Sequence, residues 1–582
     1  MKEAHGGDRI AEVLVQHGVR HLFALCGGHI SPILTGAQAR NIAVIDVRDE
    51  ANAVFAADAV ARMTGVVGVA AVTAGPGVTN TLTAVKNAQM AQTPLLILGG
   101  ATATLLKGRG SLQDIDQLAL MAPATKWATS VRSVPALAAT IERALTVARS
   151  GVPGPVFVEV PVDLLYPESV VRGWYEKEVG IGQAKGLAAK ALGYYVKAHL
   201  YKQFHAPGLP DISMPELADV LPSRGHDAIV ALASAALASA QKPVVVVGSQ
   251  ALVGMTDPGR LARALMSLGL PVFLGGMARG LLGRAHELQF RHARSAALQQ
   301  ADCVVVAGFP FDFRLGYGRG INKDATVIAA NLSMSELRKN RKPQLAAHMH
   351  AGEFLVGLAD CRRERADLTP WFAALRGREL ARDQEIASQA ITTGPLVDPV
   401  QLFLRIEEAM AHDAALVVDG GDFVATGSYI VRPRAPLSWL DPGVFGTLGV
   451  GGGFALGAAL VRPGREVWLL WGDGSSAYSL AEFDTFVRHG VAPIAVIGND
   501  ASWAQIAREQ VDVLGTPLAT TLLRTDYHKV AEGYGGVGMV LDDPARIDTT
   551  LAEAKRIAAN GRPVCINVHL RKTDFRKGSL SM

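Results

Sequence analysis

Two acidic residues, Asp473 and Asp500, each follow an apolar run that reads as a buried strand. The runs span 466–472 and 493–499, and an amphipathic helix pattern at 479–490 separates them. A right-handed crossover of this kind makes the strands parallel and places both carboxylates beyond the carboxyl ends, where open α/β sheets bind ligands. Neighbouring carboxylates repel unless a cation neutralises them, so this pattern indicates Mg²⁺, which binds carboxylates together with phosphate oxygens.

The residues around Asp473 suit a phosphate. Gly472 and Gly474 flank the acid, and Ser475 and Ser476 follow it. Glycines let backbone amides approach a phosphate closely, and the serines add donors near the start of a helix. We therefore predict a Mg²⁺–diphosphate site. The alternative is a turn acid and an unrelated surface acid, since short motifs also occur by chance.

Three α/β domains are expected to position these groups. The chain has 582 residues, more than a single core supports. Its composition of 49% hydrophobic and 19% charged residues with 61 glycines is typical of buried parallel sheets with many tight turns. We predict three doubly wound parallel-sheet domains, whose common pattern suggests an ancient duplication.

The domain limits follow from where strand-like runs alternate with helical patterns. The strand-like runs are 21–28, 42–50, 67–77, 93–100 and 154–163, then 242–250, 270–276, 301–308 and 325–333, then 415–422, 466–474, 494–500 and 563–570. We predict a first domain at 1–165, a linker or surface insertion at 166–213, a central domain at 214–375, a linker at 376–396, a third domain at 397–565, and a tail at 566–582 that is a candidate lid.

Composition argues against several classes of protein. A net charge of +4 is too balanced for nucleic-acid binding. Cys26, Cys303, Cys361 and Cys565 form no CxxC pair, which argues against zinc and disulfides. The N-terminus lacks an export pattern, and the apolar stretch 227–240 is shorter than the ~20 residues of a membrane span. We expect a cytoplasmic enzyme with no nucleic-acid or membrane partner.

The motif 472–474, followed after some twenty-five residues by the pair Asn499 and Asp500, resembles the signature of thiamine-diphosphate (ThDP) enzymes. The segments 73–85 and 444–461 resemble two further motifs of that family. The resemblance implies ThDP and Mg²⁺ as cofactors, a pyrimidine-binding first domain and a diphosphate-binding third domain. It also implies at least a homodimer, and we expect a homotetramer, because the family builds each cofactor site from two subunits.

The resemblance assigns the metal ligands to Asp473, Asp500 and the carbonyl of Ser502. The family usually has Asn where this chain has Asp500, which retains an oxygen ligand and adds a charge. Leu448 is expected to hold the two cofactor rings in a bent conformer, and the Gly446 carbonyl to accept from the aminopyrimidine. The predicted cofactor-binding set is Gly446, Leu448, Gly472, Gly474, Ser475, Ser476 and Trp503.

Three residues of the first domain are the predicted catalytic groups. Glu50 matches the family carboxylate that hydrogen-bonds the aminopyrimidine and promotes activation of the thiazolium carbon; alone, Glu50 and Asp49 could both be helix-capping acids. His29 in a glycine-rich loop and Gln113 resemble substrate-side residues of benzaldehyde lyase, and Gln113 also matches acetolactate synthase. The alternative for His29 is a loop cap.

Over nearly its whole length the chain resembles the acetolactate-synthase-like 2-hydroxyacyl-CoA lyases (type 2) of this family. That resemblance implies reversible cleavage of a 2-hydroxyacyl-CoA to formyl-CoA and an aldehyde, with His29 transferring the hydroxyl proton and Gln113 orienting the oxygen. The alternatives are acetolactate synthase, a benzaldehyde-lyase-like carboligase, oxalyl-CoA decarboxylase, and a non-catalytic nucleotide-binding relative.

A CoA substrate needs cations for its phosphates, and Arg is suited to them. Arg279, Arg294 and Arg314 of the central domain are the candidates, with basic residues of the tail as further ones; each alone reads equally well as solvated surface charge. The central domain is also a candidate for an ADP-type nucleotide or CoA, although it lacks a full G-x-G-x-x-G fingerprint.

Overall fold

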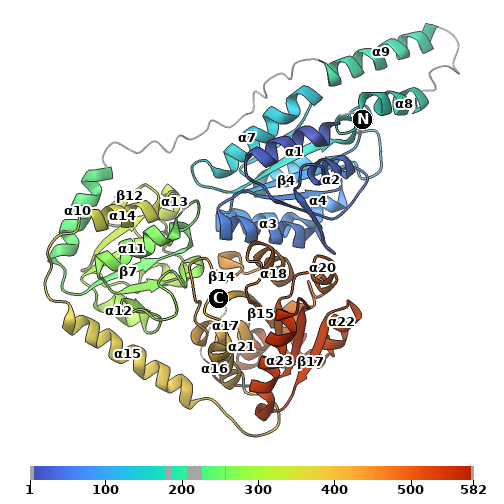
Figure 1. The fold of residues 1–582 in the computed structure, drawn as a ribbon. Coiled ribbons are helices and arrows are strands. Elements are labelled where there is room, and N and C mark those ends of the chain that lie inside the picture. The colour runs from blue at the N-terminus through green and yellow to red at the C-terminus, as the bar shows by residue number, and fades with distance from the viewer. Residues whose placement is uncertain (1–4, 179–186, 206–225, 256, 578–582) are drawn as a thin grey trace. The chain divides into compact units, whose positions relative to one another are not determined.

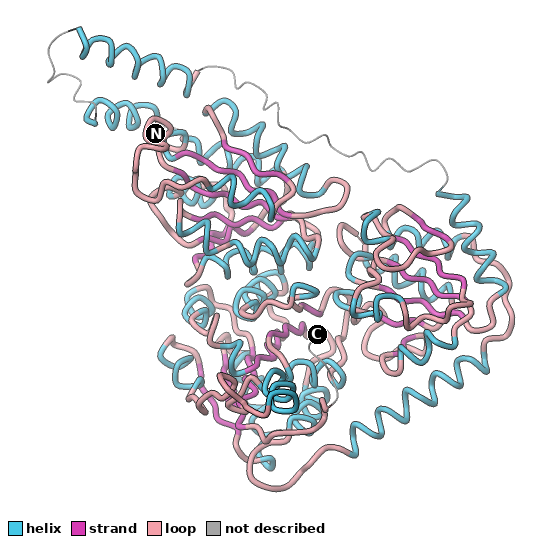
Figure 2. The backbone as a smooth tube through the Cα atoms, turned by 180° about the vertical axis from the view of Figure 1, so that it is seen from behind, coloured by secondary structure: helices cyan, strands magenta, loops and turns pink. Residues whose placement is uncertain are grey.

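The computed structural model describes residues 5–178, 187–205, 226–255 and 257–577 (Figure 1). The chain divides into two compact units, Met1–Ala218 and Asp219–Met582. The first unit contains one six-stranded sheet and the second contains two, and every strand pair in them is parallel. Helices border the strands of each sheet (Figure 2). The predicted fold class, three parallel-sheet α/β domains, is confirmed.

The sheet of the first unit has the order β2-β1-β3-β4-β6-β5. Its inner strands β3, β4 and β6 are buried along their whole length, as expected for strands covered on both faces. The strands are β1 His21–Ala24, β2 Ala43–Asp46, β3 Gly68–Val72, β4 Leu95–Ala101, β5 Trp127–Ser130 and β6 Pro155–Pro161. The helices are α1 Gly6–Gln16, α2 Ser31–Gln38, α3 Glu50–Thr64, α4 Pro76–Asn80, α5 Leu82–Ala91, α6 Gln117–Met121, α7 Leu137–Arg149, α8 Glu168–Glu178 and α9 Leu187–Phe204.

The central sheet has the order β12-β11-β10-β7-β8-β9. Counted from β7 this is the 3-2-1-4-5-6 order of dinucleotide-binding folds, with its switch point between β7 and β10. The strands are β7 Pro243–Val247, β8 Val272–Leu274, β9 Gln289–Phe290, β10 Cys303–Ala307, β11 Thr326–Ala330 and β12 Leu345–Ala347. The helices are α10 His226–Ser239, α11 Pro258–Leu268, α12 Arg294–Gln300, α13 Met334–Leu337 and α14 Ala351–Asp360.

The third sheet has the order β14-β13-β15-β16-β18-β17, which repeats that of the first sheet strand for strand. The strands are β13 Ala415–Asp419, β14 Trp439–Leu440, β15 Val467–Gly472, β16 Ile494–Asn499, β17 Val537–Leu541 and β18 Val564–His569. The helices are α15 Thr369–Ser388, α16 Pro399–Ala409, α17 Asp422–Ile430, α18 Val450–Val461, α19 Asp473–Ser476, α20 Glu482–Arg488, α21 Ala504–Leu514, α22 Tyr527–Gly533 and α23 Ile547–Ala559. The expectation of one common architecture thus holds for the outer sheets, whereas the central sheet has a different strand order.

The elements cross several predicted domain limits. The region 166–213, predicted as a linker or surface insertion, contains the helices α8 and α9 among its described residues. Helix α15 runs through the limit at 375, and β18 runs through the limit at 565. The limit at 213 lies outside the described residues. Within the parts of the chain that the structure describes, no helix is both long and apolar enough to cross a membrane.

Candidate cofactor and active site

The predicted metal ligands lie together at one edge of the third sheet. β15 and β16 pair in parallel, with Gly472 opposite Gly498, so Asp473 and Asp500 both follow strand ends. The amide of Ser502 donates to the Asp473 carboxylate at 3.3 Å. The crossover predicted from the sequence therefore brings these three residues together.

The electrostatics of this edge favour a bound cation. Burial, together with the charges of Asp473 and Asp422, raises the pKa of Asp500 to about 7. Burial also raises the pKa of Asp473, which is 3% exposed. Carboxylates so placed are destabilised as anions until a cation compensates them, and an all-oxygen donor set suits a hard ion such as Mg²⁺. The residues present fit the predicted metal.

A tight turn follows β15. A β-carbon added to Gly474 would lie 2.5 Å from the Trp503 ring, so a larger residue cannot enter without moving the indole. The hydroxyl of Ser475 donates to the Asp419 carbonyl at 2.8 Å, and that of Ser476 to the Asp473 carbonyl at 2.8 Å. These bonds hold the turn in shape; contact of Gly472, Gly474 and the serines with a diphosphate stays a prediction.

Asp419, the last residue of β13, is a residue that the sequence analysis missed. Its fully buried carboxylate accepts the Gly449 amide at 3.1 Å, the Gly451 amide at 2.8 Å and the Trp471 indole at 3.0 Å. Burial raises its pKa to about 6. The carboxylate thereby fixes the turn that precedes α18 and contains Gly446 and Leu448. An acid at a strand end followed by two glycines was the available signal.

Glu50 begins α3 in the first unit and is 7% exposed. Asp49 accepts the Ala51 amide at 2.7 Å and is the helix cap, so Glu50 does not perform that role. Instead the Asn80 amide donates to Glu50 Oε2 at 3.0 Å. Asn80, at the end of α4, was also missed, although it lies in the segment 73–85 that carried the resemblance.

The other two predicted catalytic residues, His29 and Gln113, lie beside the turn 73–77, which leads from β3 into α4. His29 Nδ1 lies 3.2 Å from Thr73 Oγ1, and burial lowers the pKa of this imidazole. Gln113 has a positive φ of 64° and packs on Gly75, whose added β-carbon would lie 2.8 Å from the Gln113 carbonyl oxygen. An added β-carbon on Gly77 would lie 3.6 Å from Glu50 Oε1. The fold thus gathers all three around one turn.

Gln117 holds that turn through hydrogen bonds, and the sequence analysis did not identify it as a site residue. Its Oε1 accepts the Gly75 amide at 2.9 Å, and its Nε2 donates to the Gly100 carbonyl at 3.1 Å and to Glu159 at 2.9 Å. Gln117 is 2% exposed and Glu159 is 1% exposed. Buried hydrogen-bond networks of this kind fix a backbone in one conformation.

The predicted CoA-phosphate arginines lie near one another in the second unit. Arg294 and Arg314 both approach the ring of Phe309, at 5.8 and 4.7 Å, two residues beyond β10 and thus at the switch point. Arg314 pairs with Asp312 at 2.6 Å, and Arg279 donates to the Ser428 carbonyl at 3.1 Å. Burial lowers the pKa of Arg294, and the charges of the other two arginines lower it further. Phosphate binding by this cluster stays a prediction.

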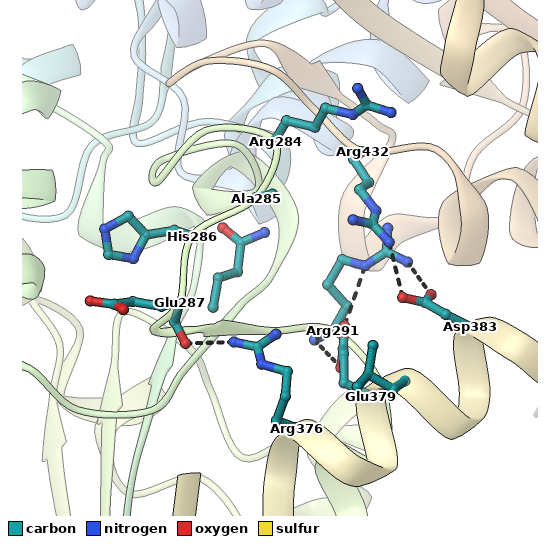
Figure 3. Close-up of a pocket in the computed structure, with 11 residues that line it drawn as sticks. Arg284, Ala285, His286, Glu287, Arg291, Arg376, Glu379, Asp383 and Arg432 are labelled. Atoms are coloured by element: carbon teal, nitrogen blue, oxygen red, sulfur yellow. Dashed lines mark hydrogen bonds and ion pairs between the residues drawn. The ribbon is translucent and has the colours of Figure 1, made fainter. Parts of the chain in front are cut away.

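A cavity of about 380 Å³ lies elsewhere in the second unit, between α15 and the loop before β9 (Figure 3). Asp383 and Glu379 reach toward His292 closely enough to suggest a metal site. However, Asp383 pairs with Arg432 at 3.0 Å and with Arg291 at 3.4 Å, and Glu379 accepts the amides of Arg291 and His292. These acids already have cationic or amide partners, so the cluster reads as structural.

Comparison with known proteins agrees with this geometry. Models of the thiamine pyrophosphate enzyme family match the chain at 4–120 for the N-terminal TPP binding domain, at 230–358 for the central domain, and at 419–568 for the C-terminal TPP binding domain. The chain belongs to the thiamine pyrophosphate enzyme family. The two TPP-binding matches contain Glu50 and Asp473 respectively, so this family assignment rests on the same two domains as the predicted cofactor site.

Three relatives illustrate where the chain lies among thiamine pyrophosphate (thiamine diphosphate) enzymes. It is 48% identical to 2-hydroxyacyl-CoA lyase 2 of Danio rerio, over 99% of this chain and 93% of that protein. It is 46% identical to 2-hydroxyacyl-CoA lyase 2 of Homo sapiens, over 99% and 92%. Identity to a probable acetolactate synthase of Mycobacterium bovis is 34%, over 97% and 95%.

Proposed function

We propose that the chain is a ThDP- and Mg²⁺-dependent 2-hydroxyacyl-CoA lyase. It would cleave a 2-hydroxyacyl-CoA to formyl-CoA and an aldehyde one carbon shorter, and in reverse join formyl-CoA to a carbonyl compound. The observation that carries the proposal is the gathering of Glu50, His29 and Gln113 around the turn 73–77. Identity of 46–48% to relatives named 2-hydroxyacyl-CoA lyase 2, against 34% to an acetolactate synthase, supports this substrate class.

ThDP, when bound, supplies a nucleophilic carbon and a place to hold the electrons of the broken carbon–carbon bond. Asp473, Asp500 and the Ser502 carbonyl would hold Mg²⁺, and the turn after β15 would hold the diphosphate. Leu448 and Gly446 would contact the rings, on a turn that Asp419 keeps in place. Trp503 would close the side of the turn at Gly474.

Glu50 would hold a proton against the aminopyrimidine ring of the cofactor. Its side chain is almost fully buried, and a positioned carboxyl is a common acid–base group in catalysis. Asn80 bonds Oε2, while Oε1 is the oxygen nearer to Gly77. The side chain is therefore held in one orientation before the cofactor arrives.

His29 would accept the proton of the substrate's 2-hydroxyl group as the carbon–carbon bond breaks. Burial lowers its pKa, which favours the neutral imidazole that a base requires. Gln113, which packs on Gly75 of the same turn, would orient the substrate oxygen through its amide. The aldehyde leaves, and protonation of the remaining carbon completes formyl-CoA.

The substrate's CoA portion would lie along the central domain. The cluster of Arg279, Arg294 and Arg314 at the switch point of a dinucleotide-type sheet supports a phosphate-bearing ligand there, whether CoA or an ADP-type nucleotide. Of the tail, residues 571–574 line a cavity of about 260 Å³ with Asp500, which supports its role as a cover for the substrate. A homotetrameric, cytoplasmic enzyme is part of the proposal.

The test is detection by gas chromatography of the aldehyde released from 2-hydroxyacyl-CoA substrates by the purified protein with ThDP and Mg²⁺. Wild type is expected to release aldehyde and formyl-CoA in equal amounts, and to convert pyruvate far more slowly. Release of no aldehyde by a protein that binds ThDP would exclude the CoA-lyase assignment. Acetolactate from pyruvate would then identify the acetolactate synthase alternative.

A further inference from the structure

Helices α8 and α9 lie outside all three matched family segments, which end at 120 and resume at 230. They pack against the rest of the first unit through a small apolar cluster. Val171 and Tyr175 of α8 pack against Val196 and Leu200 of α9, and these four side chains are at most 3% exposed. Ala103 belongs to the same cluster. Leu105 and Leu106 pack against the same cluster. This hairpin therefore covers the chain just after β4.

A buried carboxylate joins the hairpin to that same stretch. Asp163, fully buried after β6, accepts both the amide and the hydroxyl of Thr104, at 3.1 and 2.6 Å. Tyr175 from α8 and Gln203 from α9 donate to the same carboxylate. Gln203 also donates to the Thr104 hydroxyl at 2.6 Å, and His199 lies 2.8 Å from it. Thr104 is thus bonded directly by α9, and through Asp163 it is linked to Tyr175 of α8.

The chain runs from Thr104 directly to Gln113. Lys107 pairs with the buried Glu159, and the Ser111 hydroxyl donates to the Leu106 carbonyl at 3.1 Å. Gln113 then takes its positive φ and rests on Gly75. The loop is otherwise exposed, with Leu112 at 82%. The bonding at Thr104 is thus an anchor at the N-terminal start of the loop, before the Lys107 pair.

We propose that the α8–α9 hairpin positions the loop that carries Gln113, with Gln203 and Tyr175 as positioning residues that act through Asp163 and Thr104. Hydrogen bonds to a buried carboxylate are among the stronger ones in proteins, and each restricts where Thr104 can lie. The role of Gln113 toward the substrate rests on the proposed lyase function. The alternative is a hairpin that only spaces two domains, which would leave this loop unaffected by changes in the hairpin.

The first test is hydrogen–deuterium exchange of the full-length protein with ThDP and Mg²⁺. In Gln203→Leu the amides of 102–112 should exchange on the order of tenfold faster than in wild type, whereas those of β1 and β3 should not change. Tyr175→Phe, which removes one hydroxyl and retains the ring, should act in the same direction. Tyr201→Phe, at a position 65% exposed on α9, is the matched control and should have no effect. Unchanged exchange at 102–112 in both hairpin variants would overturn the proposal.

The second test is a double-mutant cycle on lyase activity. Gln203→Leu alone should lower kcat on the order of tenfold, with the affinity for ThDP unchanged. In a Gln113→Ala background the same change should have little further effect, because the hairpin acts through Gln113. A further loss of about tenfold in the double variant, as independent effects on the free energy of activation would give, would overturn the proposal. If wild type shows no lyase activity, the proposed function fails while the exchange experiment still decides the role of the hairpin.

Discussion

At the scale of single residues, Asp49 and Glu50 show how neighbouring acids acquire different roles. The Asp49 carboxylate accepts the backbone amide of Ala51, two residues ahead, and acts as a helix cap. Glu50 instead takes its partner from Asn80, 30 residues away. That partner comes from the turn that His29 and Gln113 also border. The bond therefore holds Glu50 at the place where the predicted chemistry occurs.

Replacing Glu50 with Gln removes the ionisable carboxyl group and retains the shape of the side chain. We expect kcat for aldehyde release to fall at least about 100-fold, the usual range for loss of an acid–base group. Calorimetry should show ThDP binding retained within a few-fold. Asp49→Asn is the control, because Asn caps helices as well as Asp and activity should be near wild type. Equal losses in both variants would assign Glu50 a structural role.

Asp419 predicts a pH dependence of stability. Its carboxyl keeps a proton up to about pH 6 in the folded protein, but only to about pH 3.9 when unfolded. The folded state therefore binds more protons than the unfolded state between these pH values. The contribution of Asp419 to the free energy of unfolding consequently falls as pH rises from 4 to 6, by on the order of 2 kcal/mol.

The measurement is the difference in unfolding free energy between wild type and Asp419→Asn across pH 4 to 7, in which other titrations cancel. This difference should fall up to about pH 6 and then level off. Asp398→Asn controls for the loss of a buried carboxylate that accepts two backbone amides in the same domain. Parallel curves for wild type and Asp419→Asn would contradict the assignment.

At the scale of elements, the residues that reach across the fold were the ones not found from sequence. Asp473 and Asp500 were predictable because one strand–helix–strand unit contains both. Asn80 meets Glu50 from another helix, and Asp419 meets Gly449 from 30 residues away. Such partners depend on how separate segments pack, and local spacing carries no information about that.

The strands missing from the sequence analysis share one property, which is that all of them lie at sheet edges. An edge strand is short and only partly covered, so it lacks the continuous apolar run that marked the inner strands. β9 has only two residues. In β17 four of the five residues are half-buried, so its burial does not alternate between a buried and an exposed face. The predicted runs all correspond to inner strands, apart from β2. The missed strands are β5, β9, β12, β14 and β17.

The turn after β15 gives a prediction at this scale. Gly474→Ala places a methyl group against the Trp503 ring, and either the indole or the turn must move. We expect ThDP affinity, measured by calorimetry with Mg²⁺ present, to weaken about tenfold or more. Gly533→Ala in the same domain meets no neighbouring atom and should bind ThDP as wild type does. Unchanged affinity in Gly474→Ala would show that the turn does not hold the cofactor.

At the scale of the whole molecule, the two domains matched by the TPP binding domain models share one strand order. The first and third sheets match strand for strand, whereas the central sheet has another order. The outer domains differ in the residues near their strand ends: one has Glu50, and the other has the acids Asp473 and Asp500. Neither domain has both sets, and we therefore predict that a complete cofactor site requires one domain of each kind.

If the two sets come from different subunits, inactive variants should complement one another. Glu50→Gln and Asp473→Asn are each expected to be inactive, whereas chains co-expressed or refolded together should recover about one quarter of wild-type activity. Half of randomly formed dimers are mixed, and each has one intact site of two. The measurement is the activity of the whole assembled mixture, with the presence of mixed oligomers verified by different tags on the two chains. No recovery, in oligomers shown to be mixed, would place both sets in one subunit's site.

The contact between Gly474 and Trp503 also gives the molecule an optical property. Of the seven tryptophans, Trp127, Trp371, Trp439, Trp468 and Trp471 are buried in sheet or helix packing. Trp174 lies on the hairpin, and Trp503, between β16 and α21, is half-buried and packs against Gly474 of the turn after β15. Emission from a half-buried indole changes when water around it is replaced by another molecule. The unlabelled protein therefore carries a fluorescent reporter of whatever occupies that turn.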